Sequence, residues 1–246
     1  MNKFLFLILI STFSFSQSKS GVVVYDLYIT LDEATLEMDK KFKLLQKAVD
    51  VSKEIEYVLK FNDNEANFTQ VAPERLDFVA LNAVNVLSGV SKNNYLNIEK
   101  KFILKEILAT GYLFKKEEFV VKDTLNTSWE ITKESKMIGD YLCFKATTKK
   151  KTIKIVDDKQ KEFFENVTAW FAPSLPFSFG LANYAGLPGL ILELQDKLVG
   201  FVVKKIKLNE KLTIEILKAD KIITSDEYNQ LSKERMDLLM EMSEQK

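Results

Sequence analysis

Few side chains in this sequence have the chemistry of a catalytic group. The 246 residues include no histidine and a single cysteine, Cys143. Histidine is the commonest general base and metal ligand, so its absence excludes Ser-His-Asp triads, Cys-His pairs and histidine-zinc sites. Cys143 has no histidine to activate its thiol. We interpret it as a small hydrophobic residue, and the sequence leaves its burial open.

Ser178 lies in a segment similar to a nucleophile elbow. In PFSFG, residues 176–180, Ser178 takes the serine position of G-x-S-x-G, but Pro176 replaces the first glycine and the triad base is lacking. We therefore expect Ser178 to be a loop residue. The sequence has no phosphate-binding loop or dinucleotide fingerprint, and NDNEAN, residues 62–67, lacks the glycine and terminal glutamate of a calcium loop. No catalytic residue, cofactor or metal site is predicted.

The carboxylates leave one enzymatic alternative open. Only the fold can bring two of the 35 acidic residues together as a general acid and a general base. Glu193 is the candidate, because it interrupts the aliphatic run LILEL, residues 190–194. The period of a strand places Glu193 opposite to Leu192 and Leu194, which predicts an outward-facing side chain. The sequence alone therefore does not decide whether the protein is an enzyme.

The uncharged stretch AWFAPSLPFSFGLANYAGLPGLI, residues 169–191, combines aromatic side chains with turn-forming residues. Three of the four prolines and four of the eight glycines lie between Pro173 and Gly200, which predicts an irregular loop between strands. A loop this apolar packs under a sheet, lines a cavity or meets a partner. We predict that the apolar binding residues of the protein lie here: Trp170, Phe171, Pro173, Pro176, Phe177, Phe179, Tyr184, Gly186, Leu187, Pro188 and Gly189.

The end of this loop also has the spacing of a structural corner. Gly186 permits a backbone conformation that other residues avoid. Pro188 fixes its own φ and extends the residue before it, and Gly189 allows a tight turn into the strand that follows. Because glycine and proline act first through backbone geometry, we favour a structural role for Gly186, Pro188 and Gly189 over direct contact with a ligand.

The first sixteen residues have the pattern of a secretory signal peptide. Lys3 precedes the apolar run Phe4–Ile10, and small residues follow up to Ser16. We therefore predict export, to the periplasm or the periplasmic face of the outer membrane, without a transmembrane segment in the mature chain. Removal of Lys3 leaves 34 basic and 35 acidic residues, a balance that argues against nucleic acid as a partner. Asp123-Thr124-Leu125 fits a short O-glycosylation pattern of some bacterial envelopes, and only a mass measurement would test it.

Strands dominate the predicted elements. Gly21–Thr30 is rich in β-branched and aromatic residues, and Ile55, Tyr57, Leu59 and Phe61 alternate with polar residues. We read Asn62–Asn67 as a turn and leave residues 75–87 unassigned. Further strands are predicted at Phe102–Leu108, Tyr112–Phe114, Phe119–Val121, Ser128–Thr132, Tyr141–Thr148, Thr152–Val156, Val167–Phe171, Leu190–Leu194, Leu198–Lys205 and Leu212–Leu217.

Two helices complete the prediction. Met38, Phe42, Leu45 and Val49 follow a helical period. At the chain end, Thr224 and Glu227 form a capping box, and an apolar stripe predicted to pack on the sheet follows it: Tyr228, Leu231, Leu238, Leu239 and Met242. The predicted class is α+β, mainly antiparallel β, with a curved meander sheet in a single domain over residues 17–246.

One family shares the motifs of the second half. The run GLPGLILEL from Gly186, the stretch AWFAPSLPFSFGLANYA before it, WEI at Trp129 and IGDYLCFKATT at Ile138 closely resemble the GLPGLI family of exported proteins from Gram-negative bacteria. The resemblance covers roughly residues 125–200. Leu181 stands where the family pattern has a proline. The resemblance implies an envelope protein whose role is not established, and by analogy a sheet similar to the half-barrel of periplasmic lipoprotein carriers.

Three functions are compatible with these observations. A non-enzymatic binding or chaperone-like protein would hold an apolar small molecule, a lipid or a peptide segment against the aromatic loop. A structural envelope component would use the same loop to bind a membrane protein. A carboxylate-based hydrolase would need two acids in one pocket. The absence of a catalytic motif argues against the hydrolase. The sequence does not separate a binding protein from a structural component, because both would use the same residues; we take the binding protein as the leading hypothesis.

Overall fold

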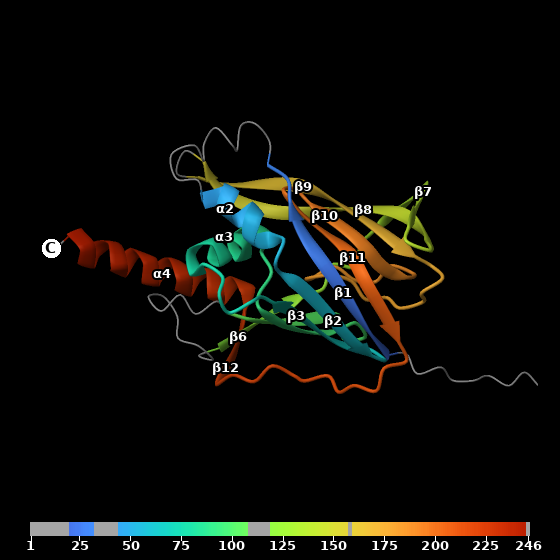
Figure 1. The fold of residues 1–246 in the computed structure, drawn as a ribbon. Helices are drawn as coiled ribbons and strands as arrows, with labels where there is room; N and C mark the ends of the chain where they lie inside the picture. The colour runs from blue at the N-terminus through green and yellow to red at the C-terminus, as the bar shows by residue number, and fades with distance from the viewer. Residues whose placement is uncertain (1–19, 32–43, 108–118, 157–158, 245–246) are drawn as a thin grey trace, which may run out of the picture.

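The computed structural model describes residues 20–31, 44–107, 119–156 and 159–244. Its strands are β1 Ser20–Ile29, β2 Glu56–Asn62, β3 Glu65–Val71, β4 Asn93–Asn97, β5 Phe102–Glu106, β6 Phe119–Thr124, β7 Glu130–Ile138, β8 Tyr141–Val156, β9 Lys159–Ala172, β10 Leu190–Asp196, β11 Val199–Leu208 and β12 Lys221–Thr224. Its helices are α2 Leu44–Ser52, α3 Phe78–Ser88 and α4 Ser225–Glu244 (Figure 1). The predicted signal peptide and the predicted strand Tyr112–Phe114 lie outside the described residues.

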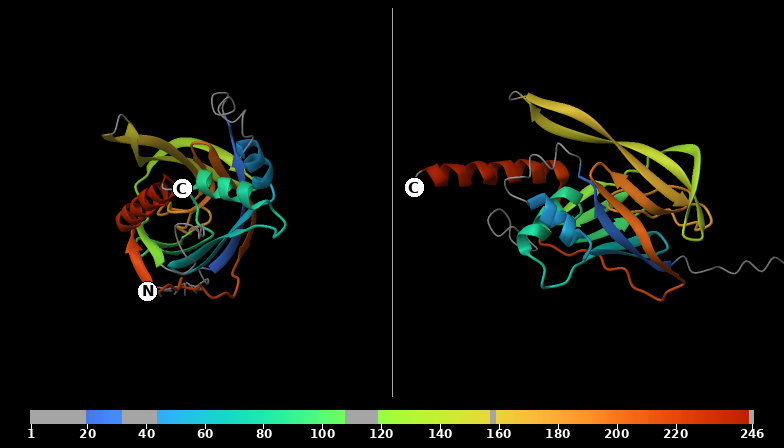
Figure 2. Two further views of the ribbon diagram at one scale, coloured as in Figure 1. Left: turned by 90° about the vertical axis from the view of Figure 1, so that its left-hand side faces the viewer. Right: turned by 45° about the horizontal axis from the view of Figure 1, so that its top comes forward.

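All twelve strands belong to one open, curved sheet made of two antiparallel meanders. β1 to β6 lie side by side in chain order, as do β7 to β11, and the meanders join where β11 pairs with β1. β12 pairs in parallel with β6 at one edge. Seen from one end, the sheet curls most of the way round (Figure 2, left). The predicted class, mainly antiparallel β with a curved meander sheet and helices, is confirmed.

Successive side chains along each strand point to opposite faces of the sheet, so the curved sheet has an inner and an outer face. In β2 the side chains of Tyr57, Leu59 and Phe61 are buried in the main core, while Lys60 is exposed on the other face. Directly opposite residues of antiparallel strands share a face, so the buried row continues from strand to strand. Tyr25 in β1 belongs to it, and its hydroxyl donates a hydrogen bond to the Ile191 carbonyl oxygen at 2.8 Å. Burial raises the pKa of Tyr25.

Helices α2 and α3 pack together at one end of the curved sheet (Figures 1 and 2). α3 begins at Asp77, whose carboxylate accepts a hydrogen bond from the Ala80 N–H, and it ends at Gly89 with φ of 61°. A buried polar contact joins it to the sheet: the Gln70 amide donates to Asn85 Oδ1 at 2.6 Å. These caps and this contact explain why most of the unassigned stretch 75–87, which follows no clear apolar period, lies in a helix.

Helix α4 begins as predicted but leaves the sheet after its first turns. Glu227 Oε2 accepts a hydrogen bond from the Thr224 N–H, and the Thr224 hydroxyl accepts one from the Glu227 N–H, which completes the capping box. Tyr228 and Leu231 pack on the edge of the sheet. Farther along, α4 projects away from it (Figure 1), and Leu238 is 58% exposed. No helix in the described part of the chain is long and apolar enough to cross a membrane.

Three predicted elements need correction. Asn62–Asn67 is not one turn, because Glu65 already begins β3 and pairs with Asn62 of β2. Thr152–Val156 is not a separate strand but the continuation of β8. Leu212–Leu217 is not a strand: residues 209–220 form an extended segment, which we name the strap, that runs from the end of β11 to the start of β12 (Figure 1).

Candidate binding site

The aromatic loop, residues 173–189, fills the inside of the curved sheet. Phe179, Leu181 and Leu187 are fully buried in the main core. The ring of Phe61 lies 4.8 Å from that of Phe177 and 5.1 Å from that of Phe179, measured between centroids. The interior that a carrier would offer to an apolar ligand is thus occupied here by the protein's own side chains.

Hydrogen bonds hold the backbone of this loop on both sides of the GLPGL corner. The Gly186 N–H donates a hydrogen bond to the Ser178 carbonyl oxygen at 2.9 Å, and the Leu190 N–H donates to that of Leu175 at 2.9 Å. The indole N–H of Trp129 donates to the Ala185 carbonyl oxygen at 2.8 Å. Gly186 has φ of 86°, which a residue with a side chain rarely adopts. The corner interpretation of GLPGL therefore has a structural basis.

The eleven residues predicted to bind do not form one surface. The structure buries Phe171, Phe179, Tyr184, Leu187 and Gly189, half-buries Trp170 and Phe177, and exposes Pro173, Pro176, Gly186 and Pro188. Trp170 and Phe171 are consecutive in β9 and so point to opposite faces of the sheet. Ligand contact by these residues stays a prediction, and the buried ones would need a movement of the loop to reach a ligand.

Glu193 lies on the same face as Trp170, since the two residues are directly opposite in β10 and β9. Lys136 Nζ lies 2.7 Å from Glu193 Oε2 and 4.4 Å from the centroid of the Trp170 ring. The carboxylate is thus neutralised by a lysine. In the described residues no three His, Cys, Asp or Glu side chains gather as metal ligands, and nothing around Glu193 supports the hydrolase alternative.

Cys143 is buried beside this ion pair. Burial raises the pKa of its thiol from 9.0 to about 11, while the charge of Lys136 lowers it to a smaller extent. The thiol therefore stays protonated at neutral pH, where a protonated thiol is a poor nucleophile. This answers the question of burial that the sequence left open and agrees with the interpretation of Cys143 as a small hydrophobic residue.

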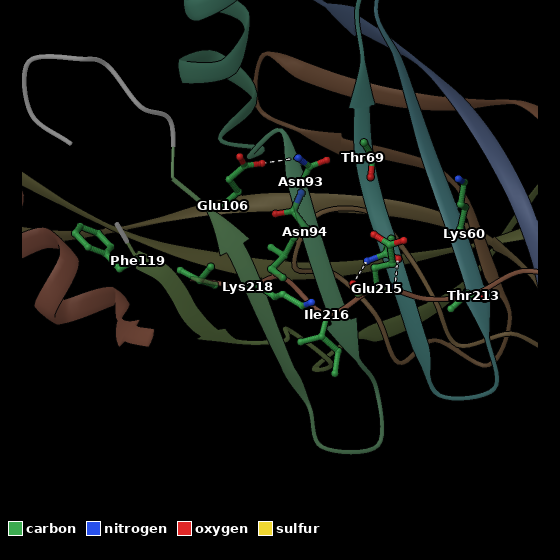
Figure 3. A pocket seen from close by; sticks show the side chains of 13 residues that line it. Lys60, Thr69, Asn93, Asn94, Glu106, Phe119, Thr213, Glu215, Ile216 and Lys218 are labelled. Atoms are coloured by element: carbon green, nitrogen blue, oxygen red, sulfur yellow. Dashed lines mark hydrogen bonds between the residues drawn. The ribbon is translucent and has the colours of Figure 1, made fainter. Parts of the chain in front are cut away.

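A groove of about 1040 Å³ lies on the outer face of the first meander, between the strands and the strap (Figure 3). Its floor is a row of side chains across four neighbouring strands: Thr69, Asn93, Glu106 and Val120. Lys60 stands at the β2 end and Phe119 at the β6 end. The Asn93 amide donates a hydrogen bond to Glu106 Oε2 across the floor. The groove therefore has a polar middle and one apolar end.

The strap forms the opposite wall of the groove. Asn67 of β3 binds its backbone twice: the side-chain amide donates to the Glu215 carbonyl oxygen at 2.7 Å, and Asn67 Oδ1 accepts from the Glu215 N–H at 2.8 Å. Ile214 and Leu217 pack on Tyr95 and Leu104, the next residues along the outer face. The strap crosses seven strand spacings, roughly 34 Å, while its twelve residues reach about 40 Å when fully extended. It is therefore nearly taut.

Removing the Asn67 side chain should release the strap without unfolding the sheet. We expect Asn67→Ala to speed cleavage by trypsin after Lys211 and Lys218 roughly tenfold, because two backbone hydrogen bonds are lost from an exposed segment. Limited proteolysis with mass analysis of the fragments measures this. Asn93→Ala, an amide on the same face that does not touch the strap, is the matched control. Equal cleavage rates for Asn67→Ala and the unchanged protein would contradict this role of Asn67.

A second cavity of about 470 Å³ lies between the end of α3, strands β5 and β6, and the start of α4. Lys105 Nζ and Asp123 Oδ2 pair across it at 2.7 Å. Burial alone would raise the pKa of Asp123, but the hydrogen bond and charge of Lys105 together with other hydrogen bonds lower it below its ordinary value. Lys105 and Asp123 of this cavity already pair with each other, and the cavity is less than half the volume of the groove, so we regard the groove as the candidate site.

Sequence reasoning did not find the groove. Its floor residues come from four strands, two of which, β3 and β4, were not predicted as strands. NNYLN at 93–97 has three asparagines in five residues, and asparagine is depleted in strands; EANFTQV at 65–71 follows the turn-forming residues Asn62–Asn64 and has one asparagine itself. For β3 the sequence did contain one signal, the alternation of inward-facing and outward-facing residues: Ala66, Phe68 and Gln70 are buried, and the residues between them lie on the outer face.

Comparison with known proteins finds a family model that matches part of the chain and a solved structure with a similar fold. Residues 129–193 match the family model described as "Protein of unknown function (Porph_ging)". This match lies within residues 125–200 and confirms the resemblance of that region to a family without an assigned function. A search of curated proteins found no match.

A solved structure of PNGF-II has a similar fold. The structure of PNGF-II in the P21 space group has 11% sequence identity and a TM-score of 0.51, covering 89% of this chain and 34% of that chain. The structure in the C2 space group has 11% identity and a TM-score of 0.47, covering 88% and 33%. The chain thus spans about a third of the PNGF-II chains that it matches. At this identity the likeness concerns the fold alone.

Proposed function

We propose that this protein is an exported, non-enzymatic binding protein that holds an extended polypeptide segment in the groove beside the strap. The comparisons give a family of unknown function and a shared fold, and they do not identify a ligand. Export rests on the predicted signal peptide. The polypeptide ligand rests on the chemistry of the groove, and above all on the contact between Asn67 and the strap.

Asn67 provides the observation that carries the proposal. Its side-chain amide pairs with both the N–H and the carbonyl oxygen of Glu215, which is the way an amide side chain binds an extended backbone without regard to its side chains. The outer face of the sheet thus already holds one extended segment, the strap, which crosses the strands instead of pairing with them.

Asn93 repeats this chemistry one row away. Thr69 and Asn93 are directly opposite in β3 and β4, as are Asn67 and Tyr95 on the same face. Asn93 gives one amide hydrogen to Glu106 Oε2; its second amide hydrogen and its Oδ1 have the chemistry to bind the backbone of a segment lying along the groove, as Asn67 binds the strap. The groove extends over five strands, β2 to β6, roughly 19 Å, which fits about six extended residues.

Binding of an unfolded chain tests the proposal. The probe is fluorescein-labelled, reduced and carboxymethylated α-lactalbumin, which presents extended segments and cannot refold. We expect saturable binding by fluorescence anisotropy, and roughly tenfold weaker binding by Asn93→Ala, the effect of about one hydrogen bond to the ligand. Asn229→Ala, an exposed amide that lines the second cavity, is the matched control and should bind as the unchanged protein does.

Two results would contradict the proposal. Absence of binding to the labelled chain would remove the polypeptide as ligand. Binding that Asn93→Ala leaves unchanged and Asn229→Ala weakens would move the site to the second cavity. Native folding of each variant is checked by its unfolding transition, because both asparagines lie at the surface of the groove or cavity and their loss should leave the core intact.

A further inference from the structure

Glu106 is a carboxylate in the floor of the groove, held in place by its neighbours. It is the last residue of β5, it is half-buried, and it lies directly opposite Val120 of β6. From the side of β4, the Asn93 amide donates a hydrogen bond to Glu106 Oε2 (Figure 3). The position of this carboxylate is therefore fixed before any ligand arrives.

No lysine or arginine of the described residues forms an ion pair with Glu106. Lys105, the preceding residue, points to the other face of the sheet, where its Nζ lies 2.7 Å from Asp123 Oδ2. Lys218 lines the groove from the strap, but it is exposed and does not pair with Glu106. A carboxylate has about four acceptor positions, and the bond from Asn93 uses one. The others remain for a ligand.

Three other half-buried carboxylates of the sheet do have a lysine beside them. A lysine Nζ lies 2.7 Å from a carboxylate oxygen of Asp123, of Glu193 and of Asp196. A charge that is partly removed from water needs such a partner, because it has lost part of its hydration. Within the described residues, Glu106 has an amide where these three carboxylates have a cation.

We infer that the segment held in the groove places a basic side chain, lysine or arginine, against Glu106. This inference rests on the proposed function, because it specifies the chemistry of the polypeptide segment that the groove holds. An ammonium or guanidinium group donates charge-assisted hydrogen bonds to the carboxylate and neutralises it. Glu106 then selects among segments by their side chains, while Asn93 binds the backbone of any of them.

The place of Glu106 in the groove also limits where the basic residue lies in the segment. Glu106 is one strand from the β6 end of the groove and three strands from the β2 end, roughly 5 Å and 14 Å. About four further extended residues therefore reach the β2 end. Lys60 stands there and repels a second cation. The inference thus concerns one basic residue near the end of the bound segment, not basic segments in general.

A set of three peptides tests the charge preference. Each is a fluorescein-labelled nonapeptide of alternating serine and threonine whose central residue is lysine, glutamine or glutamate, and fluorescence anisotropy measures its binding. We expect the lysine peptide to bind roughly threefold more tightly than the glutamine peptide, and the glutamate peptide roughly threefold less tightly, the effect of one partly exposed ion pair. Both differences should shrink in about 0.5 M salt, which screens the charges.

Substitutions in the groove test the role of Glu106 itself. Glu106→Gln should bind the three peptides equally well, and Glu106→Lys should reverse their order. Glutamine keeps an oxygen that accepts the hydrogen bond from Asn93, so Glu106→Gln should unfold as the unchanged protein does. Glu215→Gln is the matched control. Glu215 lines the same groove, and Asn67 binds its backbone and not its side chain, so the order of the peptides should stay the same.

The outcomes separate this inference from the proposed function. Equal binding of the three peptides by the unchanged protein would overturn the inference and leave the proposed function standing. So would binding of the unfolded α-lactalbumin chain without binding of any peptide. A preference that Glu215→Gln abolishes and Glu106→Gln preserves would move the cation to the strap and also overturn the inference. If neither the peptides nor the unfolded chain bind, the proposed function fails together with the inference.

Discussion

Replacement of Gly189 by alanine should lower the free energy of unfolding by about 3 kcal/mol or more, because the new methyl group overpacks a site with no room. A Cβ at Gly189 would lie 2.3 Å from the carbonyl oxygen of Ala172 and 2.6 Å from its carbonyl carbon. Both atoms belong to the backbone at the end of β9, which cannot turn aside as a flexible side chain would. Urea unfolding, followed by the fluorescence of Trp129 and Trp170, measures the loss.

Gly139→Ala provides the matched control for this prediction. Gly139 has a positive φ, 56°, which Gly189 does not, and a Cβ at Gly139 would meet nothing within 4 Å. Its replacement should therefore cost only about 1 kcal/mol, the strain of a left-handed backbone conformation. A loss for Gly189→Ala no larger than that for Gly139→Ala would show that the close packing of the GLPGL corner against β9 does not matter for stability.

Replacement of Phe179 by alanine should lower the free energy of unfolding by about 3–5 kcal/mol, the range for a fully buried aromatic side chain. Phe179 lies inside the curved sheet, with its ring 5.1 Å from that of Phe61. The loss removes packing from both the loop and β2. Urea unfolding measures this change as well, and Phe61→Ala, which removes the other ring of the contact, should give a similar loss that is not additive with the first.

Phe177→Ala distinguishes a loop that only packs from one that also binds. Phe177 touches the same Phe61 ring but is half-buried, so its loss should cost about half as much as that of Phe179. If Phe177→Ala also weakened binding of the labelled unfolded chain while Asn93→Ala did not, the aromatic loop would replace the groove as the candidate site. Similar stability of Phe179→Ala and the unchanged protein would show that the loop does not support the sheet.

Most strands that sequence reasoning found have a buried row of apolar side chains. Tyr57, Leu59 and Phe61 alternate with polar residues, and that period identified β2. Two strands that it missed, β3 and β4, also bury apolar side chains, among them Phe68 and Leu96, but they bury polar side chains beside them: Gln70 is buried through hydrogen bonds to Tyr57 and Asn85. A buried amide has no signature in hydropathy, because its stability depends on partners that only the fold supplies.

The strap was mistaken for a strand for a different reason. Leu212–Leu217 has strand-like side chains, and Ile214 and Leu217 do pack against the sheet. However, the segment crosses the strands, and the side chain of Asn67 binds the backbone of Glu215 in place of a neighbouring strand. Local propensity does not specify whether an extended segment runs along a sheet or across it.

The candidate site shows the same limit. The aromatic loop attracted attention because its unusual residues are contiguous in sequence, and most of its aromatic rings serve the core. The sequence could not predict the groove, because its floor residues belong to no motif and form a row only when four strands are in register: Thr69, Asn93, Glu106 and Val120. Contiguous motifs reveal corners and cores more readily than surfaces assembled from distant strands.

The central position of β1 has a consequence for the order of folding. β1 pairs with β2 on one side and with β11 on the other, where Gly21 lies opposite Leu208. Contacts between the two ends of the chain close a large loop, which slows folding. During synthesis the first meander must persist as a partial sheet with β1 as an open edge until nearly the whole chain has emerged. The pairing of β1 with β11, in the middle of the finished sheet, is therefore the last to form. Until then the open edge of β1 is the part most prone to aggregation.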